Sequence, residues 1–429
     1  MDTARAAALS LIREVTENGR LLPEVSDKFL SPLSGPERAR ALRLALTTLR
    51  WKDRADRALG PHLRMKPRPE VLNVMRLALC EIYVEGAAPH GVVGAAVDLS
   101  RGTERGKGQA GLVNAVLRNV LRKGPEAWEA LPIPHLPKWL RKPLVADYGK
   151  AAVAAMEAAF AAGAPLDLTV KDDPERWVTQ LGGTVTPTGS VRLARQGQVS
   201  KLPGYDEGAW WVQDAAATVP VRALDPQPGE RVLDMCAAPG GKTLQLAAAG
   251  AEVTALDISE GRLVQVRENL DRCALTAEIV AADALDWQGG PFDAVLLDAP
   301  CSATGTIRRH PDLPVAKTAD NFPDLFALQE RLIDRALSLV KPGGRVVFCT
   351  CSLLIDEGEE QVRDALARHP GLTVEVAPLA LPGIDPEWIG VEGLRLRPDY
   401  WPELGGMDGF FVTVLRRPTG DDDSAGGLG

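Results

Sequence analysis

The stretch Asp234-Met-Cys-Ala-Ala-Pro-Gly-Gly-Lys-Thr243 decides the fold of this 429-residue chain. It follows the apolar, strand-like segment 231–233 and opens a helical run over 243–249. A strand, a glycine-rich turn and a helix N-terminus form a corner where backbone N–H groups can approach a polar ligand closely. The turn matches neither GxGxxG nor GxxxxGK[ST], so the usual patterns of dinucleotide and triphosphate sites are both absent from it.

Strand and helix patterns alternate outward from this corner. Such alternation predicts a parallel, doubly wound sheet, closed at one edge by the strand Phe410-Phe-Val-Thr-Val-Leu415. The expected strands are 231–235, 252–257, 277–282, 293–298, 344–350, 372–376 and 409–415, and the expected helices are 242–249, 259–273, 323–340 and 357–368.

Aspartates stand at the ends of three of these strands. Asp257 comes seventeen residues after Gly240, where an acid commonly accepts hydrogen bonds from a ribose, and Asp283 and Asp298 end the next two strands. Three carboxylates would repel a pyrophosphate but attract a cation. Each aspartate alone is equally well explained as a helix cap or turn residue. Together with the glycine turn, they favour S-adenosylmethionine, whose sulfonium is positively charged.

Two cysteines, Cys301 and Cys351, follow the strands 293–298 and 344–350. Carbon 5 of a pyrimidine is a poor nucleophile, but a thiolate that adds to carbon 6 converts the ring into a reactive enamine. A hydrogen-bond donor or acid near N3 would assist this addition, and Asp298 is the nearest candidate. A single cysteine after a strand is more often a core residue. The pair beside a ligand corner predicts methyl transfer through a thiol adduct.

The composition is that of an ordinary globular protein, with 45% hydrophobic and 25% charged residues. No apolar run reaches the roughly 18 to 20 residues that cross a bilayer, and the N-terminus reads as an amphipathic helix, not as a signal peptide. The six cysteines form neither a disulfide framework nor a CxxC zinc pattern, and Cys80, Cys273 and Cys349 are expected in the core. We therefore expect a cytoplasmic protein without a metal site.

The first part of the chain is basic and helical. Residues 1–125 carry 21 Lys and Arg against 13 Asp and Glu, although the whole chain has a net charge of −8. This asymmetry is typical of a protein with a polyanionic partner, while a solvated helical surface is the plainer explanation. Apolar residues recur at helical spacing and predict a compact bundle of helices at 6–15, 39–51, 71–84, 92–99 and 110–121.

The sequence thus predicts a multidomain α and α/β protein. The helical domain spans 1–125 and is followed at 126–207 by a connector helix and a small α+β subdomain. The α/β domain spans 208–417, and a disordered tail spans 418–429.

Residues from about 205 to 417 resemble the NOP/NSUN/Sun family of RNA cytosine-5 methyltransferases. The matching segments are Trp211-Val-Gln-Asp214, Cys236-Ala-Ala-Pro-Gly-Gly-Lys-Thr243, Asp298-Ala-Pro-Cys-Ser-Ala-Thr-Gly-Thr306, Arg309-His-Pro311, Thr350-Cys-Ser352 and Asp408-Gly-Phe-Phe411. One departure is Ala303, where the family often has glycine.

This resemblance implies a Rossmann-like fold and assigns roles to both cysteines. Cys351 would be the nucleophile and Cys301 would assist product release, whereas DNA cytosine-5 methyltransferases use the cysteine of their Pro-Cys motif as nucleophile. The cofactor, S-adenosylmethionine, would be held by Cys236, Ala237, Ala238, Pro239, Gly240, Gly241, Lys242, Asp257, Asp283 and Asp298.

The N-terminal third resembles the NusB-like RNA-binding domain through Pro89-His-Gly-Val-Val-Gly-Ala-Ala-Val97 and Leu112-Val-Asn-Ala-Val-Leu-Arg118. Fusion of such a domain to this type of methyltransferase is the arrangement of bacterial enzymes that act on 16S ribosomal RNA, and a monomer is expected. Two alternatives stay open. One is an RNA-binding assembly factor with a non-catalytic methyltransferase domain, and the other is a dehydrogenase on the same doubly wound sheet.

Overall fold

The computed structural model describes residues 2–103, 106–194 and 198–419, and most of the predicted tail lies outside them. The chain forms two compact units. The helical unit comprises the described residues of 1–163 together with 307–319, and the α/β unit comprises those of 164–306 and 320–429.

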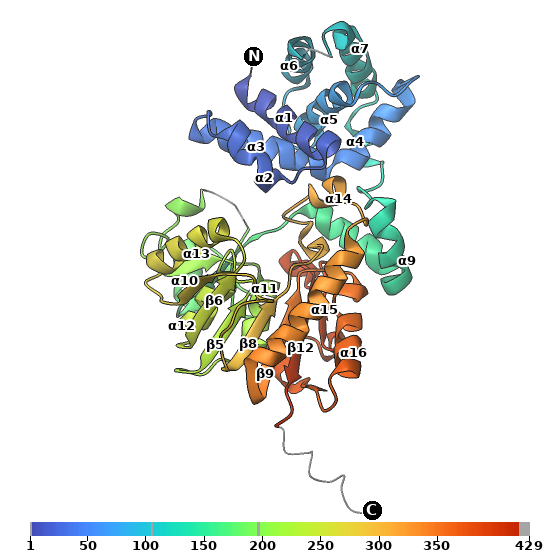
Figure 1. Ribbon diagram of the computed structural model, residues 1–429. Helices are drawn as coiled ribbons and strands as arrows, with labels where there is room; N and C mark the ends of the chain where they lie inside the picture. The colour runs from blue at the N-terminus through green and yellow to red at the C-terminus, as the bar shows by residue number, and fades with distance from the viewer. Residues whose placement is uncertain (1, 104–105, 195–197, 420–429) are drawn as a thin grey trace, which may run out of the picture. The chain divides into compact units, whose positions relative to one another are not determined.

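The helical unit contains the five expected helices, several shorter ones and the long helix α9. The expected helices are α1 (Thr3–Asn18), α3 (Gly35–Arg50), α5 (Pro69–Tyr83), α6 (Pro89–Gly102) and α7 (Ala110–Leu121) (Figure 1). Between and after them lie α2 (Leu22–Leu30), α4 (Lys52–Leu59), α8 (Pro125–Glu129) and α9 (Lys138–Ala162). The short helices α2 and α4 escape detection because two helical turns carry too few apolar repeats to define a period.

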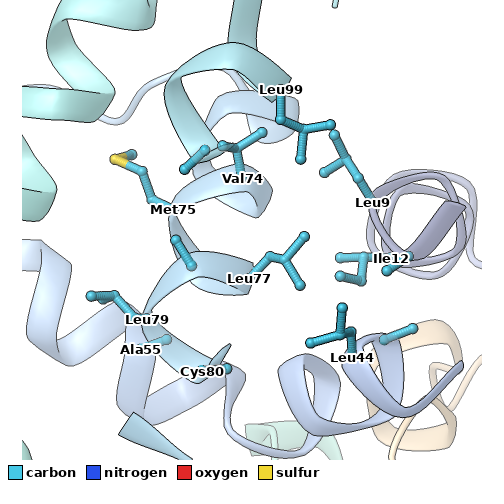
Figure 2. Close-up of a cluster of buried hydrophobic side chains, with 14 of the residues drawn as sticks. Leu9, Ile12, Leu44, Ala55, Val74, Met75, Leu77, Leu79, Cys80 and Leu99 are labelled. Carbon is cyan, nitrogen blue, oxygen red and sulfur yellow. The ribbon is translucent and has the colours of Figure 1, made fainter. Parts of the chain in front are cut away.

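Helix α5 is the centre of the helical core. It is apolar around most of its circumference, and Met75, Leu77 and Leu79 on it are almost fully buried. Figure 2 shows Leu9 and Ile12 of α1 among the side chains gathered around α5. A helix that is apolar around most of its circumference must be enclosed by other elements, which explains why α5 is surrounded here.

The segment 307–319 belongs to the helical unit, although it lies in the chain between two elements of the α/β unit. It includes α14 (Leu313–Ala316). The Asp312 carboxylate accepts a hydrogen bond of 2.9 Å from the backbone N–H of Leu22, and the Arg50 guanidinium donates to the carbonyl of Arg308 at 2.7 Å. This segment therefore provides hydrogen-bond acceptors for the start of α2 and for the end of α3.

The α/β unit is built on the large sheet β10-β12-β9-β8-β5-β6-β7, with β11 pairing beside it on β12. Strands β5 to β9 are parallel, as predicted, and the fold class is confirmed. The strands are β5 (Arg231–Met235), β6 (Glu252–Asp257), β7 (Glu278–Ala281), β8 (Phe292–Asp298), β9 (Val340–Thr350), β10 (Thr373–Val374), β11 (Leu394–Leu396) and β12 (Phe410–Arg416).

The expected edge position of β12 is wrong. It pairs with β9 on one side and with both β10 and β11 on the other, so it is an inner strand. The helices of this unit are α10 (Pro174–Leu181), α11 (Ala215–Leu224), α12 (Gly241–Ala248), α13 (Glu260–Arg272), α15 (Phe322–Leu339) and α16 (Glu359–Arg368). Helix α15 runs along β8 and β9 (Figure 1).

A second, antiparallel sheet of order β2-β3-β1-β4 is formed by β1 (Leu166–Val170), β2 (Thr184–Val185), β3 (Val191–Leu193) and β4 (Trp210–Val212). The buried Asp167 of β1 forms an ion pair with Arg192 at 2.6 Å and accepts a hydrogen bond from the backbone N–H of Ala215. These contacts join the small sheet to α11. The boundary between the two compact units lies at residue 163, whereas the expected boundaries were at 125 and 207. The difference arises because α9 belongs to the helical unit.

Candidate active site

The corner between β5 and α12 adopts the predicted strand–turn–helix geometry. Gly240 has φ +99° and immediately precedes α12, a conformation that disfavours any side chain. The buried Asp257 carboxylate accepts hydrogen bonds from the backbone N–H groups of Ala238 at 3.1 Å and Ser259 at 2.9 Å. Cys236 and Ala237 donate to the carbonyl of Leu256. The turn is thus fixed to the end of β6.

Asp234 is a buried acid at the base of this corner. One of its carboxylate oxygens accepts a hydrogen bond from the Thr243 hydroxyl at 2.6 Å, while the other has no hydrogen-bond partner in the described part of the chain. Burial raises the pKa of Asp234 to about 7. An unpaired acceptor in the interior is costly, so this oxygen fits a site that also receives a polar ligand.

Because its pKa is raised from 3.8 in the folded state, Asp234 should make the protein less stable as pH rises. Between pH 3.8 and about pH 7, the Asp234 carboxyl group is protonated in the folded state and ionised in the unfolded state. From pH 5 to pH 8 the free energy of unfolding should fall by roughly 2–3 kcal/mol from this group. In Asp234→Asn, the free energy of unfolding should not show this decrease of roughly 2–3 kcal/mol. Urea unfolding curves at pH 5 and pH 8 measure it. Equal pH dependence in the two proteins would contradict this assignment.

Asp298 lies at the end of β8 and forms an ion pair of 2.7 Å with Lys242 of α12. Burial opposes the charge on Lys242, but the attraction of Asp298 outweighs it and raises the pKa of that amine. The Cys349 thiol also donates to Asp298, at 3.5 Å. Asp283 differs, because its side chain is exposed and closes its own turn by accepting from the backbone N–H of Leu285. Its contacts are those of a turn residue.

The thiols of Cys301 and Cys351 are brought together, with 3.3 Å between the two Sγ atoms. Strands β8 and β9 are parallel neighbours, and each cysteine follows the carboxyl end of one of them. The hydrogen bond with Cys351, and then burial, raise the pKa of Cys301. Cys301 therefore retains its proton more readily than a free thiol does. By contrast, Cys349 is wholly buried within β9, as expected for a core residue.

The buried Glu357 connects the loops that carry both cysteines. Its carboxylate accepts hydrogen bonds from the backbone N–H of Ser302 at 2.8 Å and from the Gln329 amide at 3.0 Å. Its own carbonyl accepts from the Thr350 hydroxyl at 2.9 Å. Ser302 follows Cys301 and Thr350 precedes Cys351, so one residue fixes the backbone beside each thiol. Sequence reasoning missed Glu357, because an acid at the start of a predicted helix usually reads as an exposed residue of the first turn.

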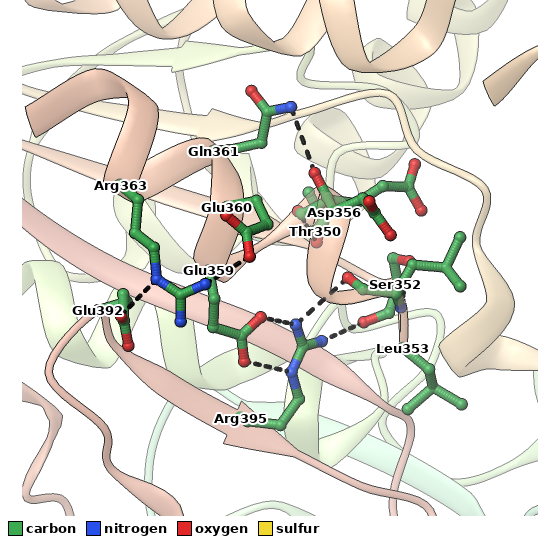
Figure 3. A network of polar contacts seen from close by, with 12 residues as sticks. Thr350, Ser352, Leu353, Asp356, Glu359, Glu360, Gln361, Arg363, Glu392 and Arg395 are labelled. Atoms are coloured by element: carbon green, nitrogen blue, oxygen red, sulfur yellow. Dashed lines mark hydrogen bonds and ion pairs between the residues drawn. The ribbon is translucent and has the colours of Figure 1, made fainter. Parts of the chain in front are cut away.

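Arg395 of β11 supports the Cys351 loop from another side. Figure 3 shows its guanidinium against the carboxylate of Glu359 and the backbone carbonyl of Ser352. It also donates to the carbonyl of Leu354. Arg395 is buried within the otherwise apolar triplet Leu394–Leu396, where the alternation of Leu and Arg would instead predict a solvent-exposed charge.

Other motif residues hold the loops in place. A Cβ on Gly305 would approach the carbonyl oxygen of Gly409 to 2.0 Å, so the two glycines allow their loops to pass in close contact. The Gln213 side-chain oxygen accepts a hydrogen bond from the Thr169 hydroxyl, and the Gln213 side-chain nitrogen donates one to the side-chain oxygen of Gln245. Ala303 has φ +59°, the left-handed conformation that glycine adopts without cost. This explains why glycine suits that position.

Metal ligands and membrane spans are absent from the described residues. No group of three or more His, Cys, Asp or Glu is arranged to hold a metal ion in the ranges that the structure covers. Within the same ranges, no helix has the length and apolar character required to cross a membrane.

Comparisons with known proteins identify the family of this chain. The family model for 16S rRNA methyltransferase RsmB/F matches residues 221–416, and the NusB family model matches residues 2–122. Ribosomal RNA small subunit methyltransferase B of Pseudomonas putida is 37% identical over 396 residues, covering 86% of this chain and 88% of that protein.

Solved structures show the same fold. PH0851 superposes with a TM-score of 0.74 at 21% identity, covering 97% of this chain and 99% of that one. NSun6 from Pyrococcus horikoshii, solved with SFG, has a TM-score of 0.56 at 21% identity and covers 66% of this chain and 98% of that one. The identity to the Pseudomonas protein over most of both chains places this chain in the RsmB/F family of ribosomal RNA small subunit methyltransferases, with an N-terminal NusB-family domain.

Proposed function

We propose that this protein methylates carbon 5 of a cytosine in 16S ribosomal RNA, with S-adenosylmethionine as methyl donor. The observation that carries the proposal is the 3.3 Å contact between the thiols of Cys301 and Cys351, next to the corner at residues 236–242. A doubly wound sheet binds its ligands at the carboxyl ends of its strands, where both thiols lie. The bacterial relative is named for the same RNA subunit.

Cys351 is the proposed nucleophile. Its thiolate forms a bond to carbon 6, and the π electron pair of the C5–C6 bond becomes available at carbon 5. Carbon 5 would then bond the methyl group while the bond of that group to the sulfonium sulfur breaks, which leaves the neutral thioether S-adenosylhomocysteine. Loss of the carbon 5 proton to a base restores the double bond and expels the Cys351 thiolate. Cys301, with its raised pKa, is suited to donate a hydrogen bond to the departing sulfur. This assignment follows the family pattern of the Thr-Cys motif and agrees with the 3.3 Å separation.

The residues of the corner fit the methyl donor. S-Adenosylmethionine, when bound, supplies the electrophilic methyl group. The backbone of Cys236 to Lys242 would hold it, with Asp257 and Asp283 towards the nucleoside and Asp298 towards the reacting atoms. The unpaired oxygen of Asp234 leaves an interior acceptor for a donor group of a bound molecule or water. N3 of cytosine carries no hydrogen and must gain a proton as the thiolate adds to carbon 6. Asp298, held in place by Lys242, would deliver that proton and then accept the hydrogen bond of the new N3–H group.

The RNA must present its target base outside a stacked helix, because a thiolate cannot reach carbon 6 within one. The basic helical unit would hold the phosphates and position the strand. Such a substrate also implies that the protein works in the cytoplasm.

A trapping experiment tests the proposal. Purified Cys301→Ala protein should form a covalent complex with unmodified 16S ribosomal RNA and S-adenosylmethionine, seen as a shifted band on a denaturing gel. The Cys301→Ala/Cys351→Ala double variant should give no band, because no thiol remains to bond carbon 6. The wild-type protein should show little band, since it releases its product.

The other outcomes of this experiment are equally informative. A band that persists in the double variant would move the nucleophile away from Cys351. Absence of a band with Cys301→Ala, together with methylation by the wild type, would remove Cys301 from product release. Cofactor binding without any methylation would instead favour an assembly factor with a non-catalytic methyltransferase domain.

A further inference from the structure

The helical unit contains a groove of about 770 Å³ that the chemistry above does not use. Its lining comes from Thr16 of α1, from the end of α3 and the first turns of α4, from residues 134–141, from the end of α9 and from the segment 307–319. All of these residues belong to the helical unit itself. A cavity of this size accommodates a ligand of about one or two nucleotides.

The groove combines cations with flat apolar surfaces. Six of its lining residues are cationic and two are acidic, and Trp139, Phe160 and several prolines supply apolar walls. The cationic residues are Arg50, Lys52, Arg57, Lys138, Arg141 and Lys317. Cationic side chains interleaved with aromatic faces are the composition of single-stranded nucleic acid sites, in which phosphates and bases are held together.

Both acids of the groove already have partners. Asp53 is paired with Arg57 at 2.9 Å and accepts the backbone N–H of His135. Glu157 is paired with Arg141 at 2.8 Å and accepts the backbone N–H of Leu136. The charges of Asp53 and Glu157 are therefore neutralised by residues of the groove itself. Through the same contacts, the two acids hold the segment 134–141 against α4 and α9.

Two cations of the groove keep their charge available. Neither Arg50 nor Lys138 has an acidic partner among the residues that the structure describes. Arg50 donates only to the carbonyl of Arg308, and its Nε is buried without any hydrogen-bond partner in that part of the chain. Burial also lowers the pKa of Arg50, which shows that its surroundings lack a compensating charge. An anion bound in the groove would supply that charge.

We infer that this groove binds the phosphodiester backbone of single-stranded RNA. The inference rests on the proposed function and names where the helical unit holds the substrate. An acidic peptide would satisfy the cations but leave the aromatic walls without bases to stack on them. The segment 307–319, which forms one wall, begins six residues after Cys301. RNA held here thus contacts a segment that is covalently continuous with the catalytic loop.

Two lysines of α9 provide a matched test. Lys138 lines the groove and Lys150 does not, while both side chains are exposed. In the full-length protein, Lys138→Glu should weaken binding of unmodified 16S ribosomal RNA by roughly tenfold at moderate salt. It should also reduce the slope of log affinity against log KCl concentration by about 1. Lys150→Glu should change affinity by less than about twofold, because distant surface charges are screened.

A second measurement needs no variant. Acylation of lysine amines in the wild-type protein, read by mass spectrometry, should show Lys138 protected by RNA and Lys150 unprotected. Equal affinities of the two variants, or equal acylation of the two lysines, would overturn the groove as an RNA site. Binding of S-adenosylmethionine should be the same in both variants. If the trapping experiment fails while Lys138 is still protected, the catalytic proposal falls and the groove stands.

Discussion

Replacing Cys351 with alanine is expected to reduce methyl transfer to RNA by roughly 10⁴-fold or more, a change of about 5.5 kcal/mol or more in the activation free energy. The physical reason is that no other group near carbon 6 can form and release the required bond. Cys301 lies 3.3 Å away, but its raised pKa keeps it protonated and a poor nucleophile. Transfer of radiolabelled methyl groups to 16S ribosomal RNA measures the loss.

Cofactor affinity should survive this substitution, because the Cys351 side chain is not among the groups that shape the corner at residues 236–242. Isothermal titration with S-adenosylmethionine should give a dissociation constant within about threefold of the wild type. Cys273→Ala is the matched control, since Cys273 is a buried free cysteine of the same unit outside the thiol pair. Activity retained by Cys351→Ala, or lost equally by Cys273→Ala, would remove Cys351 from the reaction.

Replacing Glu357 with alanine is expected to lower the free energy of unfolding of the protein by about 3–5 kcal/mol. The substitution removes a fully buried carboxylate and leaves the Ser302 backbone N–H and the Gln329 amide without their acceptor. It also frees the backbone beside both thiols, so the remaining folded protein should turn over at least roughly tenfold more slowly. Thermal unfolding and single-turnover methylation measure the two effects.

Glu357→Gln separates the two effects of this residue. It keeps an oxygen that can accept from Ser302 and should restore much of the stability lost in the alanine variant. Glu360→Ala is the control, because that acid is exposed and paired only with Arg363, so its loss should cost less than about 0.5 kcal/mol. A stability of Glu357→Ala equal to that of Glu360→Ala would show that Glu357 does not support the loops.

Local patterns were sufficient to predict the parallel sheet and the corner of the site. The strands β5 and β6 begin and end where short, mostly apolar runs place them, because a strand buried on both faces tolerates few polar residues. The pairing of β8 with β9 also makes the approach of the two cysteines understandable from sequence. The family motifs then assign them different roles, which spacing alone does not.

Contacts between residues distant in sequence were not predictable in this way. Arg395 and Glu357 act through backbone groups near Cys351 and Cys301, and nothing local in their own segments reports such partners. The same holds for the inner position of β12, since only the pairing of the short strands β10 and β11 on its other side removes it from the edge. The cofactor role of Asp283 stays a prediction, because its contact with the backbone N–H of Leu285 is compatible with a turn aspartate and with a ligand aspartate.

The insertion of residues 307–319 into the helical unit has a consequence for how the protein is made. As the chain leaves the ribosome, the first 163 residues emerge long before Asp312 and Arg308, which complete the start of α2 and the end of α3. The helical unit therefore reaches its final state only after the eight strands β1 to β8 of the α/β unit have been synthesised. The helical unit consequently cannot complete its folding before much of the α/β unit has been synthesised. The two units therefore do not fold one after the other as independent domains.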